Sequence, residues 1–231
     1  IEDACHAVGG QYQGAFIGSG RYADITVFSF HPVKIITTAE GGMAMTNQLV
    51  LAEKMQLFRA HGITRDADKM THEPDGPWYY QQIDLGFNYR MTELQAALGL
   101  SQLKCLAEFV ERRHLIAQRY EALLSSLPLS LQLQPEGAYS AMHLMVVRLQ
   151  LCCINKSHQQ VFEQLRELGV GVNVHYIPVH LQPFYQQLGF KKGDFPEAEK
   201  YYQEAISLPI FPDLSEQEVA GIVAAISEVL T

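Results

Sequence analysis

The sequence predicts a mixed α/β protein built from two parts, and three observations support this prediction. Ile25–Phe30 is a short apolar run rich in β-branched and aromatic residues, as expected of a buried strand. Apolar residues recur at helical spacing between Leu94 and Leu123. A second group of strand and helix patterns begins after Pro128. At about 150 residues per domain, the 231 residues correspond to one or two domains.

The first half alternates strand and helix patterns. Gly42–Thr46 is expected to form a second strand. Asn47 is a suitable N-cap for a helix that continues to Phe58, and Gly62 stands where a glycine would end it. Residues 63–82 are polar and irregular, so we expect an exposed excursion there.

A long helical pattern joins the two halves. Thr92, followed three residues later by Gln95, matches a capping box and predicts the start of this helix. The apolar spacing then continues to Leu123 as one helix or two nearly continuous ones. We place the domain boundary inside this stretch, so that residues 1–105 form the first domain and residues 106–231 the second.

The second half is expected to be an α+β unit. A capping box at Ser215 and Glu218 predicts its last helix. The expected elements are a strand over Met142–Leu149, a helix from Ser157 to Leu168 that stops at Gly169, a strand over Val170–Tyr176, and a helix from Ser215 to Leu230.

Composition excludes several classes of protein. A hydrophobic content of 48% argues against disorder, and the net charge of −8 argues against binding to nucleic acid or anionic membranes. No apolar run approaches the roughly 18 residues of a spanning helix, and no signal peptide is visible. The cysteines (Cys5, Cys105, Cys152 and Cys153) form no C-x-x-C pair, which gives a zinc site no support and favours reduced thiols in the cytoplasm.

Lys34 follows the first predicted strand inside a loop that contains Ser, Thr and Gly residues. A lysine in an apolar pocket has a lowered pKa and becomes a nucleophilic amine, as Schiff-base chemistry requires. Ser29, five residues earlier, could donate its hydroxyl to a phosphate. A surface lysine on an ordinary loop is the alternative, and spacing alone favours it.

Asp3 and His6 form a second candidate pair. A carboxylate that faces a pyridine nitrogen keeps the ring protonated, and a nearby histidine could contact the same ring. Asp-x-x-His by itself is a weak signal, since most such pairs belong to loops or helix caps. A metal site lacks further ligands at suitable spacing.

Asn88 and Arg90 form a third candidate group, directly before the helix that Thr92 is expected to cap. Helix N-termini bind anions well, so these polar side chains are suited to a phosphate. A turn in which Asn88 adopts a left-handed conformation is the alternative.

Taken together, the sequence resembles the DegT and StrS family of pyridoxal-phosphate-dependent nucleotide-sugar aminotransferases. Six segments carry the resemblance in the family's order: Glu2-Asp3-Ala4-Cys5-His6, Ser29-Phe30-His31-Pro32-Val33-Lys34, Glu40-Gly41-Gly42, Arg59-Ala60-His61-Gly62, Gly86-Phe87-Asn88-Tyr89-Arg90-Met91 and Val174-His175-Tyr176-Ile177-Pro178-Val179-His180. Each segment is weak alone, but the ordered set is specific, and it reverses the preference for a surface lysine at position 34.

The resemblance implies the transferase fold of type I, with pyridoxal 5'-phosphate as cofactor. Lys34 would form the Schiff base with it and later move the proton between cofactor and substrate. Asp3 would pair with the pyridinium nitrogen, His6 would contact the ring or its oxygen, and Ser29 would bind the phosphate. Family members with His in place of this lysine are dehydratases, so Lys34 fits the aminotransferase branch.

The resemblance also implies a homodimer or higher homo-oligomer, because Asn88 would reach the neighbouring subunit's phosphate, with Arg90 near the sugar nucleotide. The stretches Glu73–Tyr80 and Leu98–Leu103 look most like the branch that acts in pseudaminic acid biosynthesis. That branch aminates C4 of a UDP-linked 4-keto-6-deoxy-N-acetylhexosamine with glutamate as donor.

In the second half, the resemblance implies that His175, Tyr176 and His180 face the substrate. An ordinary strand with partly exposed polar tips is an equally good interpretation of this segment.

Only two residues precede Asp3, whereas the family pattern places a phosphate-binding turn and a stacking aromatic residue before this aspartate. We therefore expect a partial large domain followed by a small C-terminal domain, with low or absent transamination by this chain alone. The alternative is a non-catalytic truncated relic that acts as an oligomeric scaffold or binding module.

Overall fold

The computed structural model describes residues 1–231 and divides into two compact units. Unit 1 contains Ile1–Leu106 and Gly137–Tyr139, and unit 2 contains Ala107–Glu136 and Ser140–Thr231. Every helix falls short of the length or the apolar character that is needed to cross a membrane.

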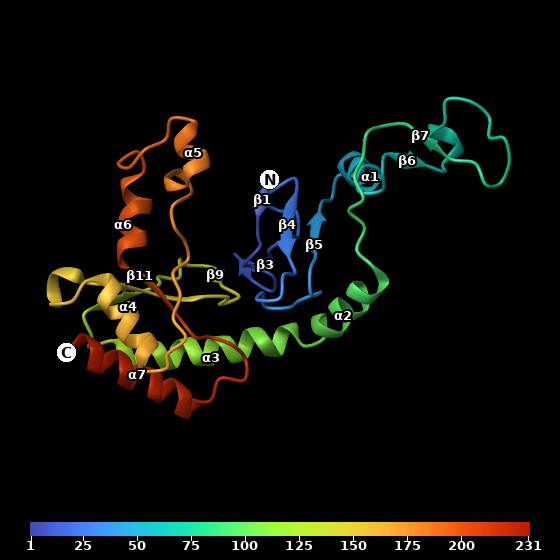
Figure 1. The fold of residues 1–231 in the computed structure, drawn as a ribbon. Coiled ribbons are helices and arrows are strands. Elements are labelled where there is room, and N and C mark those ends of the chain that lie inside the picture. The colour runs from blue at the N-terminus through green and yellow to red at the C-terminus, as the bar shows by residue number, and fades with distance from the viewer. The chain divides into compact units, whose positions relative to one another are not determined.

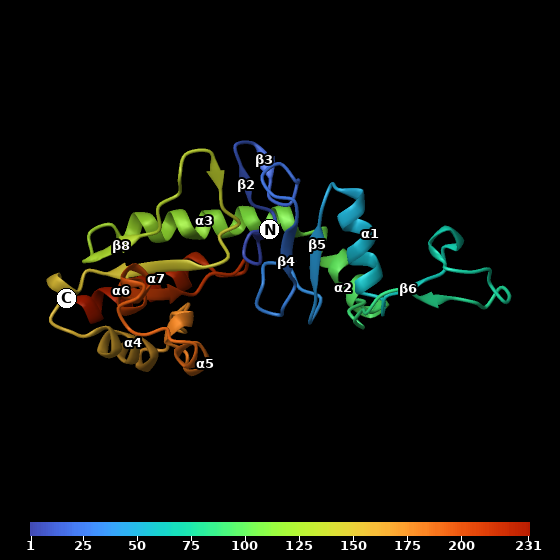
Figure 2. The same cartoon turned by 90° about the horizontal axis from the view of Figure 1, so that it is seen from above.

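A three-stranded sheet organises unit 1. It consists of β1 (Glu2–Asp3), β4 (Thr26–Ser29) and β5 (Gly42–Met45) in the order β1-β4-β5. Figure 2 shows β4 and β5 as neighbouring strands. Strand β1 runs parallel to β4, while β5 is antiparallel to it. Thr26 and Phe28 alternate as the buried residues of β4, which explains the β-branched and aromatic pattern of the sequence.

The remaining elements of unit 1 are small. They are the sheet β3-β2-β9 with β2 at Gln11–Tyr12, β3 at Ala15–Phe16 and β9 at Ala138–Tyr139, the helices α1 (Leu49–Phe58) and α2 (Glu93–Leu103), the strand pair β6 (Ile63–Thr64) and β7 (Gln81–Gln82), and a 3-10 helix at Ala67–Lys69. The excursion over residues 63–82 is thus closed at its base by two paired strands, which the sequence analysis did not predict.

Two predicted signals around α1 were wrong. The N-cap of α1 is Gln48, because the Asn47 side chain instead donates a hydrogen bond to the Ser19 carbonyl at 2.8 Å. The helix ends at Phe58, and Arg59 is its C-cap. Gly62 is required for another reason: with φ at +68°, a Cβ there would lie 1.9 Å from the Asp84 carbonyl oxygen.

Unit 2 is an α+β unit, as predicted. Its antiparallel sheet has the order β11-β10-β8. The elements are α3 (Leu106–Leu124), β8 (Leu129–Leu131), β10 (Met145–Leu149), α4 (His158–Glu167), α5 (Pro183–Gln187), α6 (Pro196–Glu204), β11 (Ala205–Leu208), α7 (Glu216–Leu230), and 3-10 helices at Leu151–Cys153 and Val179–Leu181.

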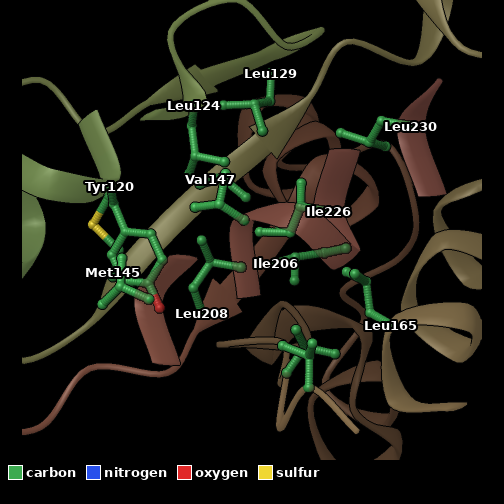
Figure 3. Packing of buried hydrophobic residues seen from close by; sticks show 14 of the residues in the cluster. Tyr120, Leu124, Leu129, Met145, Val147, Leu165, Ile206, Leu208, Ile226 and Leu230 are labelled. Carbon is green, nitrogen blue, oxygen red and sulfur yellow. The ribbon is translucent and has the colours of Figure 1, made fainter. Parts of the chain in front are cut away.

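The hydrophobic core of unit 2 lies between this sheet and the helices. Tyr120 and Leu124 of α3 meet Met145 and Val147 of β10 (Figure 3). Helix α7 packs beside α4 and adds Ile226 (Figure 1). This continuous apolar cluster holds the sheet and helices of unit 2 together.

The helix starts predicted at Thr92, Ser157 and Ser215 were confirmed. Capping boxes are present at Thr92, Ser157 and Ser215, and the long helical pattern is divided into α2 and α3. The strand predicted over Val170–Tyr176 was wrong, because its only β-pairing is an isolated bridge between Asn173 and Ser207.

Candidate active site

Asp3 and Ser29 lie at the same edge of the unit 1 sheet. Asp3 ends β1 and Ser29 ends β4, and the two strands run parallel with Asp3 opposite Val27. Parallel strands end at the same edge of a sheet, which is where ligands bind in open α/β folds. The edge therefore carries a carboxylate and a hydroxyl on adjacent strands.

Lys34 extends from the loop that leaves this edge. Its backbone N–H donates to the His31 carbonyl at 3.0 Å, which closes a turn directly after β4. The lysine is half-buried, and the next two residues, Ile35 and Ile36, are buried. These apolar neighbours fix the turn, so that Lys34 has a defined position near the sheet edge.

The loop that carries Lys34 is hydrogen-bonded to the end of β4 through the Phe30 carbonyl. The Thr37 hydroxyl and the Thr38 N–H both donate to the Phe30 carbonyl at 3.0 Å. A Cβ on Gly41 would lie 2.2 Å from the Thr38 hydroxyl oxygen, and one on Gly42 would lie 2.8 Å from the Phe28 carbonyl oxygen. The Gly-Gly pair is thus required by close packing of the loop against β4.

The charged groups at the edge interact with one another. Hydrogen bonds from the Cys5 thiol, and then from the Cys5 N–H at 3.1 Å from Asp3 Oδ1, lower the pKa of Asp3. The positive charges of His6 and Lys34 lower the pKa of Asp3 further. Asp3 is therefore ionised at neutral pH. Burial raises the pKa of the Cys5 thiol, and Asp3 raises it further.

Asn88 and Arg90 belong to a segment that lies against residues 58–62. Phe87 N–H donates to the Phe58 carbonyl at 2.6 Å, and Tyr89 N–H donates to the Arg59 carbonyl at 2.9 Å. Asn88 itself forms an isolated bridge with Ala60 and has an exposed side chain. No contact joins Asn88 or Arg90 to Asp3, Ser29 or Lys34 within this chain.

Arg90 lines a depression of about 990 Å³ between β5 and α1. Its walls are mainly apolar and include Met43, Met45, Met55 and Phe58. These residues were not predicted as part of a site, although the Gly-Met-Ala-Met run of β5, all of it exposed, is a signal of an uncovered strand. Asp3, Ser29, Lys34 and Asn88 lie outside its lining.

In unit 2, His175 and Tyr176 lie on a loop next to β11. His175 Nδ1 lies 2.8 Å from the Ser207 hydroxyl, which fixes the imidazole ring. The Tyr176 ring meets the His175 ring edge-on with centroids 4.6 Å apart, and the Tyr176 side chain is 60% exposed. Tyr176 thus presents an aromatic surface to solvent from a well-anchored segment.

His180 has different surroundings from these two residues. It is 7% exposed, and its Nε2 lies 2.8 Å from Glu199 Oε1, which also accepts the Gly193 N–H at 2.6 Å. The Phe195 ring lies 4.8 Å from the imidazole. His180 therefore joins the loop that carries Tyr176 to helix α6 and is itself enclosed. No group of three or more potential metal ligands is present in either unit.

Comparison with known proteins identifies the family. The model of the DegT/DnrJ/EryC1/StrS aminotransferase family matches residues 1–227, so the chain belongs to this family. The whole chain aligns with an uncharacterised protein, MJ1066, of Methanocaldococcus jannaschii at 40% identity and with the spore coat polysaccharide biosynthesis protein SpsC of Bacillus subtilis at 36%. The chain spans about 60% of the length of these curated relatives.

Solved structures of proteins similar to this chain support the same family assignment. Spr1654 of Streptococcus pneumoniae in its PMP form matches with a TM-score of 0.88 at 31% identity, over 98% of this chain and 57% of that one. PseC of Helicobacter pylori, an aminotransferase of pseudaminic acid biosynthesis, matches with a TM-score of 0.86 at 33% identity, over 99% and 58%. The mixed α/β fold is thus that of sugar aminotransferases over part of their length.

Proposed function

We propose that this chain carries the reactive lysine and the ring-binding carboxylate of a pyridoxal-phosphate-dependent sugar aminotransferase. The observation that carries the proposal is that β1 and β4 run parallel and end at one edge, which brings together Asp3, Ser29 and the turn that carries Lys34. Spr1654 has been solved in PLP and PMP forms, which supports the same cofactor here.

The residues at this edge fit the cofactor. A carboxylate whose pKa is lowered stays ionised and can hold a protonated pyridine nitrogen, which is the role we give Asp3. His6 would contact the ring or its phenolic oxygen, and the Ser29 hydroxyl would donate to the phosphate. When bound, pyridoxal phosphate supplies the electron sink for proton removal at the substrate carbon. Lys34 would bind the cofactor and carry that proton.

A second copy of the chain would complete this site. Asn88 has an exposed amide and no contact with the Asp3 edge of its own chain. We therefore assign Asn88 to the cofactor phosphate of a neighbouring subunit in a homodimer or larger homo-oligomer. Arg90 would bind the diphosphate of a sugar nucleotide, since a guanidinium can bind phosphate with two hydrogen bonds.

The substrate we favour is a UDP-linked 4-keto-6-deoxy amino sugar, with glutamate as amino donor. The likeness to PseC at 33% identity supports this choice. His175 and Tyr176 would contact the sugar, and His180 would act by holding their loop against Glu199. In this proposal residues 1–105 belong to the large domain of the transferase fold and residues 106–231 to its small domain.

Cofactor binding can be tested by absorbance. Wild-type chain titrated with pyridoxal phosphate should give a visible band that Lys34→Ala abolishes and Lys54→Ala, a matched lysine on α1, retains. Absence of the band in wild type, or an equal band in Lys34→Ala, would contradict the proposal. Absence of the band together with a stable oligomer in light scattering would favour the non-catalytic scaffold instead.

A further inference from the structure

Two adjacent thiols, Cys152 and Cys153, end the 3-10 helix that follows β10. Their Sγ atoms lie 3.6 Å apart, and both residues are exposed. The turn is anchored, because the Cys153 N–H donates to the Gln150 carbonyl at 2.8 Å and Leu151 packs against the core of unit 2. The two sulfur atoms are therefore presented to solvent together from a fixed position.

A direct disulfide between these two residues would be strained. The peptide bond between them is trans, so their Cα atoms are about 3.8 Å apart, whereas disulfides usually need at least about 4.4 Å. An inserted atom that binds both sulfurs makes a larger ring and relieves this strain. The pair is thus better suited to chelation than to oxidation.

The ligand must be one that binds stably through two protein sulfur atoms alone. No third His, Cys, Asp or Glu completes a metal site here, so a closed four-coordinate zinc site is excluded. Soft sulfur ligands favour a soft centre, and a centre that already carries its remaining substituent needs no third ligand from the protein.

We propose that Cys152 and Cys153 form a bidentate site for a trivalent, thiophilic arsenical. With phenylarsine oxide, two S–As bonds form and the As–O bond breaks. The two thiol protons leave with the oxygen as one water, and arsenic stays trivalent. This site lies in unit 2, is independent of Lys34, and does not depend on the proposed aminotransferase function.

Intact-mass spectrometry tests this site. The reduced 231-residue chain is incubated with phenylarsine oxide and then washed with excess glutathione, a monothiol that removes arsenic held by one sulfur. Wild type should keep one phenylarsenic group per chain until a dithiol such as 2,3-dimercaptopropanol is added. Because a second attachment strengthens binding by roughly 10²-fold or more, Cys152→Ser and Cys153→Ser should each lose the retained adduct by about that factor.

The control is the double variant Cys5→Ser, Cys105→Ser, which keeps the adjacent pair and should retain the adduct like wild type. Complete removal from wild type by glutathione would overturn the proposal. Retention by either single variant at position 152 or 153 would overturn it as well.

Discussion

His180 Nε2 lies 2.8 Å from Glu199 Oε1, and both side chains are buried in unit 2. The pair links the 3-10 helix that follows the His175–Tyr176 loop to helix α6. Glu199 also accepts the Gly193 N–H. One carboxylate therefore fixes two loops.

Stability of unit 2 should depend on pH through Glu199. The hydrogen bond from His180, followed by that from Gly193, lowers the pKa of Glu199 below its ordinary value of 4.5. A lowered carboxylate pKa stabilises the folded state fully above 4.5, and this contribution is lost as the pH falls below that value. The thermal midpoint of wild type should exceed that of Glu199→Gln above pH 4.5, and the difference should shrink in acid. A constant difference across this range would contradict the assignment.

The core should respond to truncation at Leu124. This side chain is fully buried at the end of α3, where it contacts the sheet of unit 2. Leu124→Ala should lower the free energy of unfolding by about 2–5 kcal/mol, because it leaves a cavity as well as losing apolar contacts. Leu123→Ala is the matched control on the same helix, since Leu123 is 42% exposed, and it should change little. Equal losses from the two variants would refute this packing.

The capping box of α7 offers a local test. Ser215 Oγ accepts the Glu218 N–H at 3.2 Å, and the Glu218 carboxylate accepts the Ser215 N–H at 2.8 Å. Ser215→Ala should cost about 1 kcal/mol in chemical denaturation, since a helix N–H loses its partner. Ser125→Ala, on an exposed serine beyond α3, should cost less. An unchanged denaturation midpoint for Ser215→Ala would contradict the cap.

Substitution by alanine should lower the thermal stability of the chain at Gly86 and raise it at Gly221. A Cβ on Gly86 would lie 2.1 Å from the backbone nitrogen of Gly62, so Gly86→Ala should displace the segment that carries Asn88. A Cβ on Gly221 meets nothing within 4 Å in helix α7, so Gly221→Ala should stabilise the chain by about 0.5–1 kcal/mol. Thermal unfolding of both variants measures this contrast, and equal shifts would argue against the close approach of Gly86.

Local signals in the sequence predicted the fold best. The capping boxes predicted at Thr92 and Ser215 and the helix start predicted at Ser157 were correct, because each depends on residues three positions apart. Strand β11 was missed: all four of its residues are buried, so it shows no alternation. Val170–Tyr176 was predicted as a strand because apolar residues alternate there, but tertiary pairing is limited to Asn173.

The sequence indicated which residues could form the candidate site, but it did not indicate how those residues are arranged in space. Asp3 and Ser29 are 26 positions apart, and only the parallel pairing of β1 with β4 brings them to one edge. The enclosure of His180 by Glu199 and Phe195 depends on α6 and the loop before it, which no local pattern around His180 indicates. The apolar depression beside β5 likewise arises from tertiary structure.

The central proposal is that Lys34 holds pyridoxal phosphate beside the Asp3 carboxylate. The most direct measurement is to incubate the chain with the cofactor, reduce it with borohydride and map the attached pyridoxyl group by peptide mass spectrometry. The account predicts attachment at Lys34 in wild type, and much weaker attachment there in Asp3→Asn, which keeps the shape of Asp3 without its charge. Attachment spread evenly over Lys34, Lys54 and the other lysines of wild type would contradict it.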